Sequence, residues 1–176
     1  AIFIPQLVRS FDQEDGGDGF ASRLITTISI ILFVLVAVGM YFAPALVRLY
    51  APEFFTTGFE VEKEIAIAFT RYCLPQIFFL GLFTMLGQVA NARGSFAPLM
   101  WAPIANNIVG IALFGAFLVF SPSVSIDNIS NTQVLILGWG TTLSVVVQAL
   151  VLVPVIKRLG IKLRPQWGVK GLGKSF

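Results

Sequence analysis

The sequence has no histidine and one cysteine, Cys73, among its 176 residues. Without histidine, the chain cannot build a Ser-His-Asp triad or an HExxH zinc site. A single cysteine excludes an intrachain disulfide and any zinc site that needs two or more cysteines. We therefore expect no metal site in this chain.

Charged residues are also scarce, at 12% of the chain against about 25% in a typical soluble domain. A membrane helix needs about 20 apolar residues in a row, and four uncharged segments reach that length, at 24–47, 72–92, 94–126 and 128–156. Residues 28–47 are apolar all round, without the polar stripe of a soluble helix. We predict an all-α integral membrane protein, a polytopic bundle with about four transmembrane helices at about 22–50, 64–92, 97–120 and 133–157.

Basic residues are unevenly distributed along these spans. Nine of the 12 lie on the side that holds 1–23, the turn at Arg93 and the tail from Lys157. Because cytoplasmic loops carry an excess of Lys and Arg, we expect both ends of the chain in the cytoplasm. The chain then divides into the end of a preceding helix and an acidic cytoplasmic loop, the membrane bundle, and a basic cytoplasmic juxtamembrane linker, at 1–21, 22–158 and 159–176.

Three prolines and one glycine, in the predicted helices or in the turn between two of them, are candidate conformational positions. Pro75 lies inside the second span, where it kinks the helix, and both a static kink and a wall that bends during transport fit it. Gly94 gives the short turn after that span its permissive backbone. Pro98 fits a first helical turn, and Pro103 is expected to distort the start of the same helix.

Five polar or cationic side chains inside the predicted spans are candidates to line a cavity and bind substrate. They are Arg71, Arg48, Gln76, Asn106 and Asn107. Cations inside a membrane are costly and often functional, and arginine binds phosphate groups bidentately. The alternatives are snorkelling of Arg71 to the interface or its pairing with nearby glutamates, and interhelical hydrogen bonds for the two asparagines.

Two motif-like segments do not predict a site. Residues 168–175 match the Walker A pattern, but a basic, proline-bearing stretch precedes them in place of a strand. Residues 12–19 lack the ligand spacing of a calcium loop. We expect neither a nucleotide nor a nucleic acid as a partner. A third feature, a face of the small residues Gly138, Gly140, Thr141 and Ser144, predicts close helix packing.

The segment GQVANARGSFAPLMWAPIANNIVGI, at 87–111, resembles the MurJ/MviN family of bacterial flippases of lipid-linked peptidoglycan precursor, in wording typical of actinobacterial members. The family shows a short run between two helices, matched here by Asn91, Arg93, Phe96, Pro98 or Leu99, Ala102, Pro103, and Asn106 or Asn107. Three further stretches are similar to the family in the same order, at 1–11, 70–79 and 138–160.

The resemblance implies a piece of a larger transporter of the multidrug/oligosaccharidyl-lipid/polysaccharide exporter superfamily. This chain would supply the end of helix two to helix six, in the N-terminal lobe. It implies flipping of lipid II, the undecaprenyl-pyrophosphate-linked peptidoglycan precursor, across the bacterial cytoplasmic membrane by alternating access, for cell wall synthesis. No enzymatic step and no cofactor are expected. The implied partners are the precursor, membrane lipids and the cell-wall synthesis machinery.

Two other functions stay open at this point. One is a flippase for another lipid-linked polysaccharide of the same superfamily. The other is a non-transporting membrane scaffold of cell wall assembly, which would tolerate the loss of cavity charges where a flippase would not.

Overall fold

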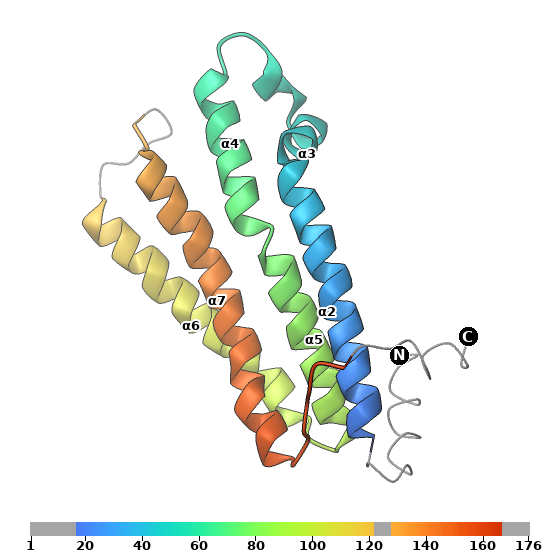
Figure 1. The fold of residues 1–176 in the computed structure, drawn as a ribbon. Coiled ribbons are helices and arrows are strands. Elements are labelled where there is room, and N and C mark those ends of the chain that lie inside the picture. Colours follow the sequence, from blue (N-terminus) through green and yellow to red (C-terminus); the bar gives the residue numbers. More distant parts are fainter. Residues whose placement is uncertain (1–16, 122–127, 167–176) are drawn as a thin grey trace.

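The computed structural model describes residues 17–121 and 128–166. The predicted Walker-like segment, the start of the acidic loop and the expected end of a preceding helix lie outside these ranges. The described residues form only helices, turns and connecting segments (Figure 1). In chain order, the helices are α2 (Asp18–Tyr41), α3 (Ala43–Tyr50), the short 3-10 helix η1 (Pro52–Phe55), α4 (Glu60–Cys73), α5 (Gln76–Ala92), α6 (Ala97–Phe120) and α7 (Asn131–Arg158).

Four helical segments of the described chain are long and apolar enough to cross a membrane. They are Asp18–Tyr41, Glu60–Ala92, Ala97–Phe120 and Asn131–Arg158. This confirms the predicted all-α polytopic membrane fold. The predicted first span, 22–50, contains two helices, because Pro44 lies in the first turn of α3 and cannot donate a hydrogen bond back into α2.

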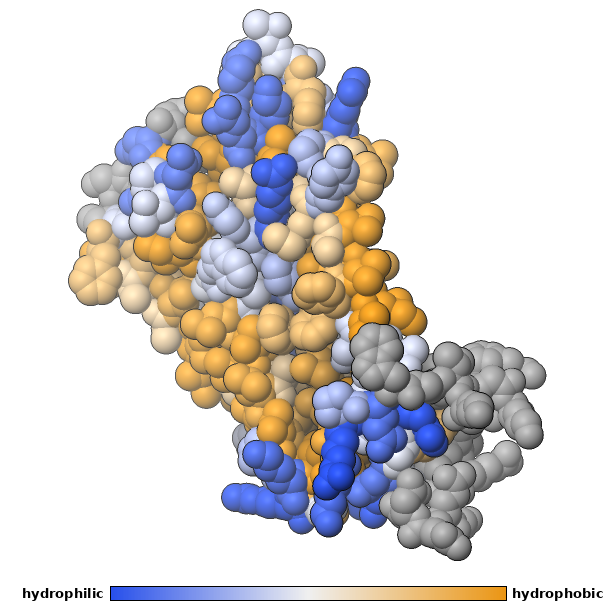
Figure 2. Space-filling view, in the orientation of Figure 1, coloured by the Kyte–Doolittle hydropathy of each residue, from blue (hydrophilic) through white to orange (hydrophobic). Residues whose placement is uncertain are grey.

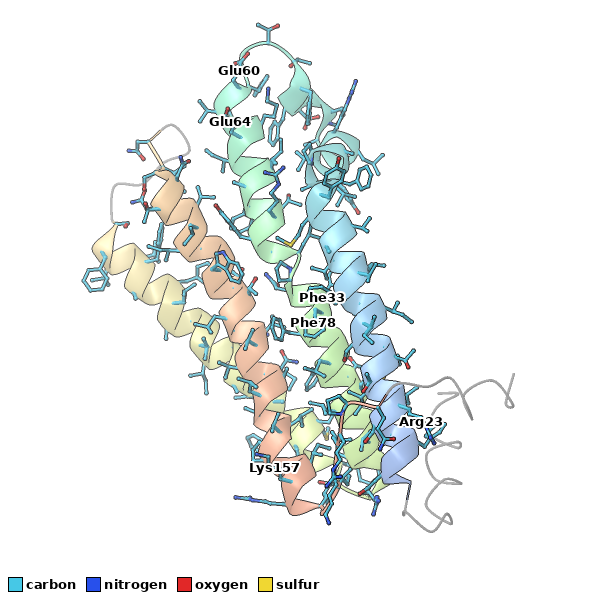
Figure 3. The ribbon with its side chains drawn as sticks, in the orientation of Figure 1. Arg23, Phe33, Glu60, Glu64, Phe78 and Lys157 are labelled. Carbon is cyan, nitrogen blue, oxygen red and sulfur yellow. The ribbon has the colours of Figure 1, made fainter. Side chains whose placement is uncertain are left out.

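The two ends of the bundle differ in charge. Arg23 and Lys157 lie at one end, called the basic end below, and Glu60 and Glu64 lie at the other, called the opposite end (Figure 3). An apolar band separates hydrophilic residues at the two ends on the face seen in Figure 2. This arrangement is the one expected of a protein that spans a membrane.

Helix α2 begins at Asp18, inside the segment 1–21 that the sequence assigned to a preceding helix and loop. An acidic residue in the first turn favours a helix start electrostatically. The Asp18 carboxylate accepts from Arg93 Nη2 at 3.3 Å and from the Lys162 backbone N–H at 3.0 Å. Asp18 therefore joins the start of α2 to the turn after α5 and to the segment after α7.

Residues 161–166, called the strap, run along α2 after α7 ends (Figure 1). Alternate backbone N–H groups of the strap donate to α2 side chains, in the pairs Lys162–Asp18 (3.0 Å), Arg164–Ser22 (3.2 Å) and Gln166–Thr26 (3.3 Å). Alternate residues of an extended chain are about 6.6 Å apart, and every fourth helical residue is about 6 Å further along the axis. The two repeats match, so part of the predicted basic linker is docked on the bundle.

The buried core lies at the basic end. Its members come from α2, α5, α7 and the strap, and they are Phe20, Ala21, Leu24, Leu86, Val89, Ala90, Leu152, Ile156 and Ile161. By contrast, α4 has no buried residue, and Ala102 is the one buried residue of α6. The helices are thus held together mainly at the basic end.

Helix α7 is the central helix, because it packs against α4, α5 and α6. A Cβ atom added at Gly138 would lie 2.5 Å from Tyr72 Cβ on α4. One added at Gly140 would collide with the Leu113 side chain on α6. The structure confirms the predicted close packing along this small-residue face.

Candidate functional site

The second span is broken at Pro75, one of the predicted conformational positions. Helix α4 ends two residues before it, and α5 begins one residue after it. Since proline has no N–H, the Arg71 carbonyl loses its donor in the helix. The N–H groups of Ile77 and Phe78 bond carbonyls three residues back, both at 3.1 Å. The break makes α4 and α5 two helices with different directions (Figure 1).

Two adjacent threonines of α7 contact both sides of this break. Thr142 Oγ1 donates to the Tyr72 carbonyl oxygen at 2.7 Å. Gln76 Nε2, at the start of α5, donates to Thr141 Oγ1 at 3.0 Å. Thr142 is 1% exposed, so this contact is shielded from water and lipid. The Gln76 amide, a predicted substrate contact, is therefore already engaged by α7.

Arg71 and Arg48 lie in the last turns of the neighbouring helices α4 and α3. Both side chains are exposed, and neither forms an ion pair with another described residue. The predicted alternative of pairing between Arg71 and the α4 glutamates is therefore not seen. The Arg48 guanidinium carbon lies 6.0 Å from the centroid of the Phe55 ring, at the outer limit of a cation–π contact.

The two asparagines share a cavity of about 400 Å³ between α6 and α7. Its lining consists of Asn106, Asn107, Gly110, Ile111, Phe114 and Ser144. Neither asparagine side chain forms a hydrogen bond with another described residue, whereas Ser144 Oγ donates to the Thr141 carbonyl at 2.7 Å. The two amides thus remain able to bind a polar group that enters this cavity.

The arginines do not line that cavity. A separate cavity of about 330 Å³ lies between α3 and α4, and its lining is mostly apolar: Leu46, Val47, Tyr50, Ala51, Ala66 and Thr70. It includes neither Arg48 nor Arg71. The structure thus brings the predicted asparagines together, ties Gln76 to α7, and leaves both arginines on the surface of the opposite half of the described bundle.

The remaining conformational candidates lie around the turn between α5 and α6. Gly94 has φ of 77°, a left-handed conformation that glycine adopts without steric cost. Pro98 lies in the first turn of α6, where its missing N–H needs no partner. Pro103 lies inside α6, which nevertheless runs unbroken from Ala97 to Phe120. The distortion expected at Pro103 therefore does not interrupt the helix.

Sequence reasoning treated Thr141 as a packing residue and did not consider Thr142, Ser22 or Thr26. The spacing of Asp18, Ser22 and Thr26, four residues apart, was a signal that three acceptors share one face of a helix. No such signal existed for Thr142, because its partner is the carbonyl of Tyr72, 70 residues away in the chain.

Comparison with known proteins adds an independent observation. The sequence model of the family described as "Lipid II flippase MurJ" matches residues 1–175. A probable lipid II flippase MurJ of Buchnera aphidicola subsp. Baizongia pistaciae is 26% identical over 154 residues, 88% of this chain and 28% of that protein. Another, of Rickettsia prowazekii, is 26% identical over 134 residues, 73% of this chain and 26% of that protein.

The chain spans about a quarter of the length of these curated relatives. The family match covers nearly all of the chain, and the described structure has four segments able to span a membrane. Both observations place the chain in a multi-pass protein of the bacterial inner membrane. On this match, the chain belongs to the lipid II flippase MurJ family.

Proposed function

We propose that the full-length protein flips lipid II across the cytoplasmic membrane by alternating access, for cell wall synthesis. The match of the MurJ family over residues 1–175 carries this proposal. In it, the chain forms part of the N-terminal lobe of the transporter. Transport changes no covalent bond, so we expect no catalytic residue and no cofactor in this chain.

The chemistry of the cargo explains why a cavity with polar walls is needed. A pyrophosphate and sugars cannot enter hydrocarbon unaided, because burial of charged and hydroxyl groups without partners is costly. The described bundle offers two arginines without ion-pair partners and two asparagines with free amides. We assign the pyrophosphate to Arg71 and Arg48, and sugar or peptide groups to Asn106 and Asn107.

The distribution of charge supports an orientation with the basic end in the cytoplasm. Arg23 and Lys157 lie at that end, and Glu60 and Glu64 at the other (Figure 3). Positive residues flank membrane spans on the cytoplasmic side. In this orientation Arg71 and Arg48 face the outer half of the membrane, where the cargo is released to the cell-wall synthesis machinery.

Depletion of the full-length protein tests the function directly. We expect less lipid-linked precursor accessible at the outer face, with accumulation at the inner face, and recovery when the wild-type protein is restored. The measurement is the cleavage of precursor by a degrading enzyme added outside the cells. Unchanged exposure in a strain without a second flippase would contradict lipid II as the cargo and leave another lipid-linked polymer or a scaffold.

Substitution of Arg71 tests the assigned site. We expect Arg71→Ala to lower precursor exposure at normal protein levels, because an anionic headgroup loses a cationic partner. Arg158→Ala, which removes an exposed cation at the basic end, is the matched control. Normal growth and wall synthesis in the Arg71→Ala strain would remove this residue from the site and favour the scaffold.

A further inference from the structure

We propose that Thr142 of α7, together with Thr141, is a positioning residue that holds the hinge at Pro75 and makes α4 follow α7 during transport. The expected effect on transport rests on the proposed function. The role of Thr142 at the hinge does not, and amide hydrogen exchange tests it separately.

The break at Pro75 removes helical hydrogen bonds on both of its sides. In a continuous helix the Tyr72 carbonyl would accept from the N–H of Gln76. Here the two residues lie on opposite sides of the break, and the oxygen accepts from Thr142 Oγ1 at 2.7 Å instead. Because an unpaired carbonyl is costly in hydrocarbon, the hinge as seen depends on this hydroxyl.

Helix α7 contacts the other side of the break as well. Gln76 is the first residue of α5, and its side-chain Nε2 donates to Thr141 Oγ1 at 3.0 Å. The Cys73 sulfur, at the end of α4, lies 3.6 Å from the same oxygen. Two neighbouring hydroxyls thus bind the last turn of α4 and the first turn of α5 together, which fixes the bend between them.

Close packing also joins α4 to α7 at the hinge. Tyr72 lies against Gly138, where an added Cβ would be 2.5 Å from Tyr72 Cβ, so α4 and α7 are in close contact at the hinge. Helix α5 packs against α7 as well, and also against α2, where Gly81 lies against Leu32. Helix α4 has no buried residue, and its contact with α7 is more extensive than its contacts with α3, η1 and α2.

The two halves of the second span therefore both contact α7 but differ in burial. Helix α5 belongs to the buried core at the basic end, and α4 is held to α7 by a pair of hydrogen bonds and a glycine contact. Arg71 precedes Tyr72 directly, so its position depends on the same contacts.

The test compares Thr142→Val, which keeps the shape of the side chain and removes its hydroxyl, with Thr142→Ser, which keeps the hydroxyl. Thr84→Val is the matched control, because Thr84 is exposed and its hydroxyl bonds the Leu80 carbonyl of its own helix at 2.9 Å. Amide hydrogen exchange of the full-length protein in nanodiscs is measured for peptides that cover 70–80 and 84–92.

For Thr142→Val we expect exchange in 70–80 to rise about threefold to tenfold, the effect of one buried hydrogen bond on a local opening equilibrium. In the same variant, exchange in 84–92 should stay at the wild-type rate. In Thr142→Ser and Thr84→Val, exchange in both peptides should stay at the wild-type rate. Equal exchange of 70–80 in Thr142→Val and wild type would overturn the proposal, whether or not the protein transports lipid II.

Transport of the precursor into proteoliposomes gives the second readout. We expect Thr142→Val to lower the transport rate by about threefold or more and Thr142→Ser to restore it. A wild-type protein that transports no precursor would contradict the proposed function but not the hinge. If Thr142→Val does not fold, Thr141→Val removes the bond to Gln76 instead, and the same rise in exchange is expected.

Discussion

The two ends of the bundle are built differently. At the basic end, α2, α5, α7 and the strap enclose nine buried apolar residues and share hydrogen bonds between segments about 140 residues apart. In the opposite half, most side chains of α3 and α4 are half-buried or exposed, and α4 buries none. Pro75 lies between these two regions, beside the threonines of α7 that bond Tyr72 and Gln76.

The difference shows how much a membrane bundle depends on specific contacts. Lipid tails are as apolar as leucine, so burial alone does not draw membrane helices together. Close packing at small residues and interhelical hydrogen bonds do so instead, and the described chain concentrates both along α7 and at the basic end. In the opposite half, α4 is joined to α7 by the Gly138 contact and the bonds at the hinge.

The largest expected effect comes from the core of the basic end. Leu152→Ala should cost about 2–5 kcal/mol of unfolding free energy, because Leu152 is fully buried and a cavity remains. Leu150, two residues away on α7, is 56% exposed, and Leu150→Ala should cost less than about 1 kcal/mol. Denaturant titration of the full-length protein in detergent measures both, and equal costs would mean that the basic end is not the core.

Substitution at the hinge contact should have the next largest effect. Gly138→Ala should cost about 1–3 kcal/mol, because the Cβ atom of Tyr72 cannot rotate away from the added methyl group. Gly110→Ala is the control, since nothing lies within 4 Å of its added Cβ and alanine favours a helix by about 0.5–1 kcal/mol. The two variants should thus shift the same titration in opposite directions.

The strap offers a test with a smaller effect. Ser22→Ala removes the oxygen that accepts from the Arg164 N–H, which should cost about 1 kcal/mol and speed the exchange of amides in 160–166. Ser29, on the same helix, forms no side-chain hydrogen bond within the described ranges, so Ser29→Ala should leave those amides unchanged. Equal exchange in the two variants would show that the strap does not depend on α2.

The smallest effect is expected at the ion pair between Asp18 and Arg93, whose side chains are 23% and 30% exposed. Asp18→Asn should cost less than about 1 kcal/mol, because a partly exposed pair is weakened by water and salt. Asparagine still accepts from the Lys162 N–H, so Asp18→Ala should cost more. The cost of the asparagine variant should shrink as salt is added, and a cost that ignores salt would argue against a charge effect.

Much of the fold could be predicted from the sequence. Uncharged segments of about 20 residues or more are long enough for membrane helices, and the described residues contain four such helical segments. The small-residue face of α7 at Gly138 was also predicted correctly, because close packing needs residues without bulk. The break between α2 and α3 was missed, since Pro44 lies in an apolar run without any charge to mark an end.

The candidate site could be predicted only in part. Polar residues inside apolar spans stand out in a sequence, so Arg71, Gln76 and the two asparagines were found. Their surroundings could not be predicted, because these depend on which helix lies opposite. Gln76 is an example, since its partner, Thr141, lies 65 residues further along the chain.

The sequence by itself determined that the chain is a set of membrane helices of the MurJ family, with basic residues gathered at one end. These features follow from local composition and order, which need no knowledge of contacts. Only the tertiary structure decided that Thr142 satisfies the Tyr72 carbonyl and that the strap binds α2. Those contacts join residues about 70 and 140 positions apart, and the packing of whole helices brings them together.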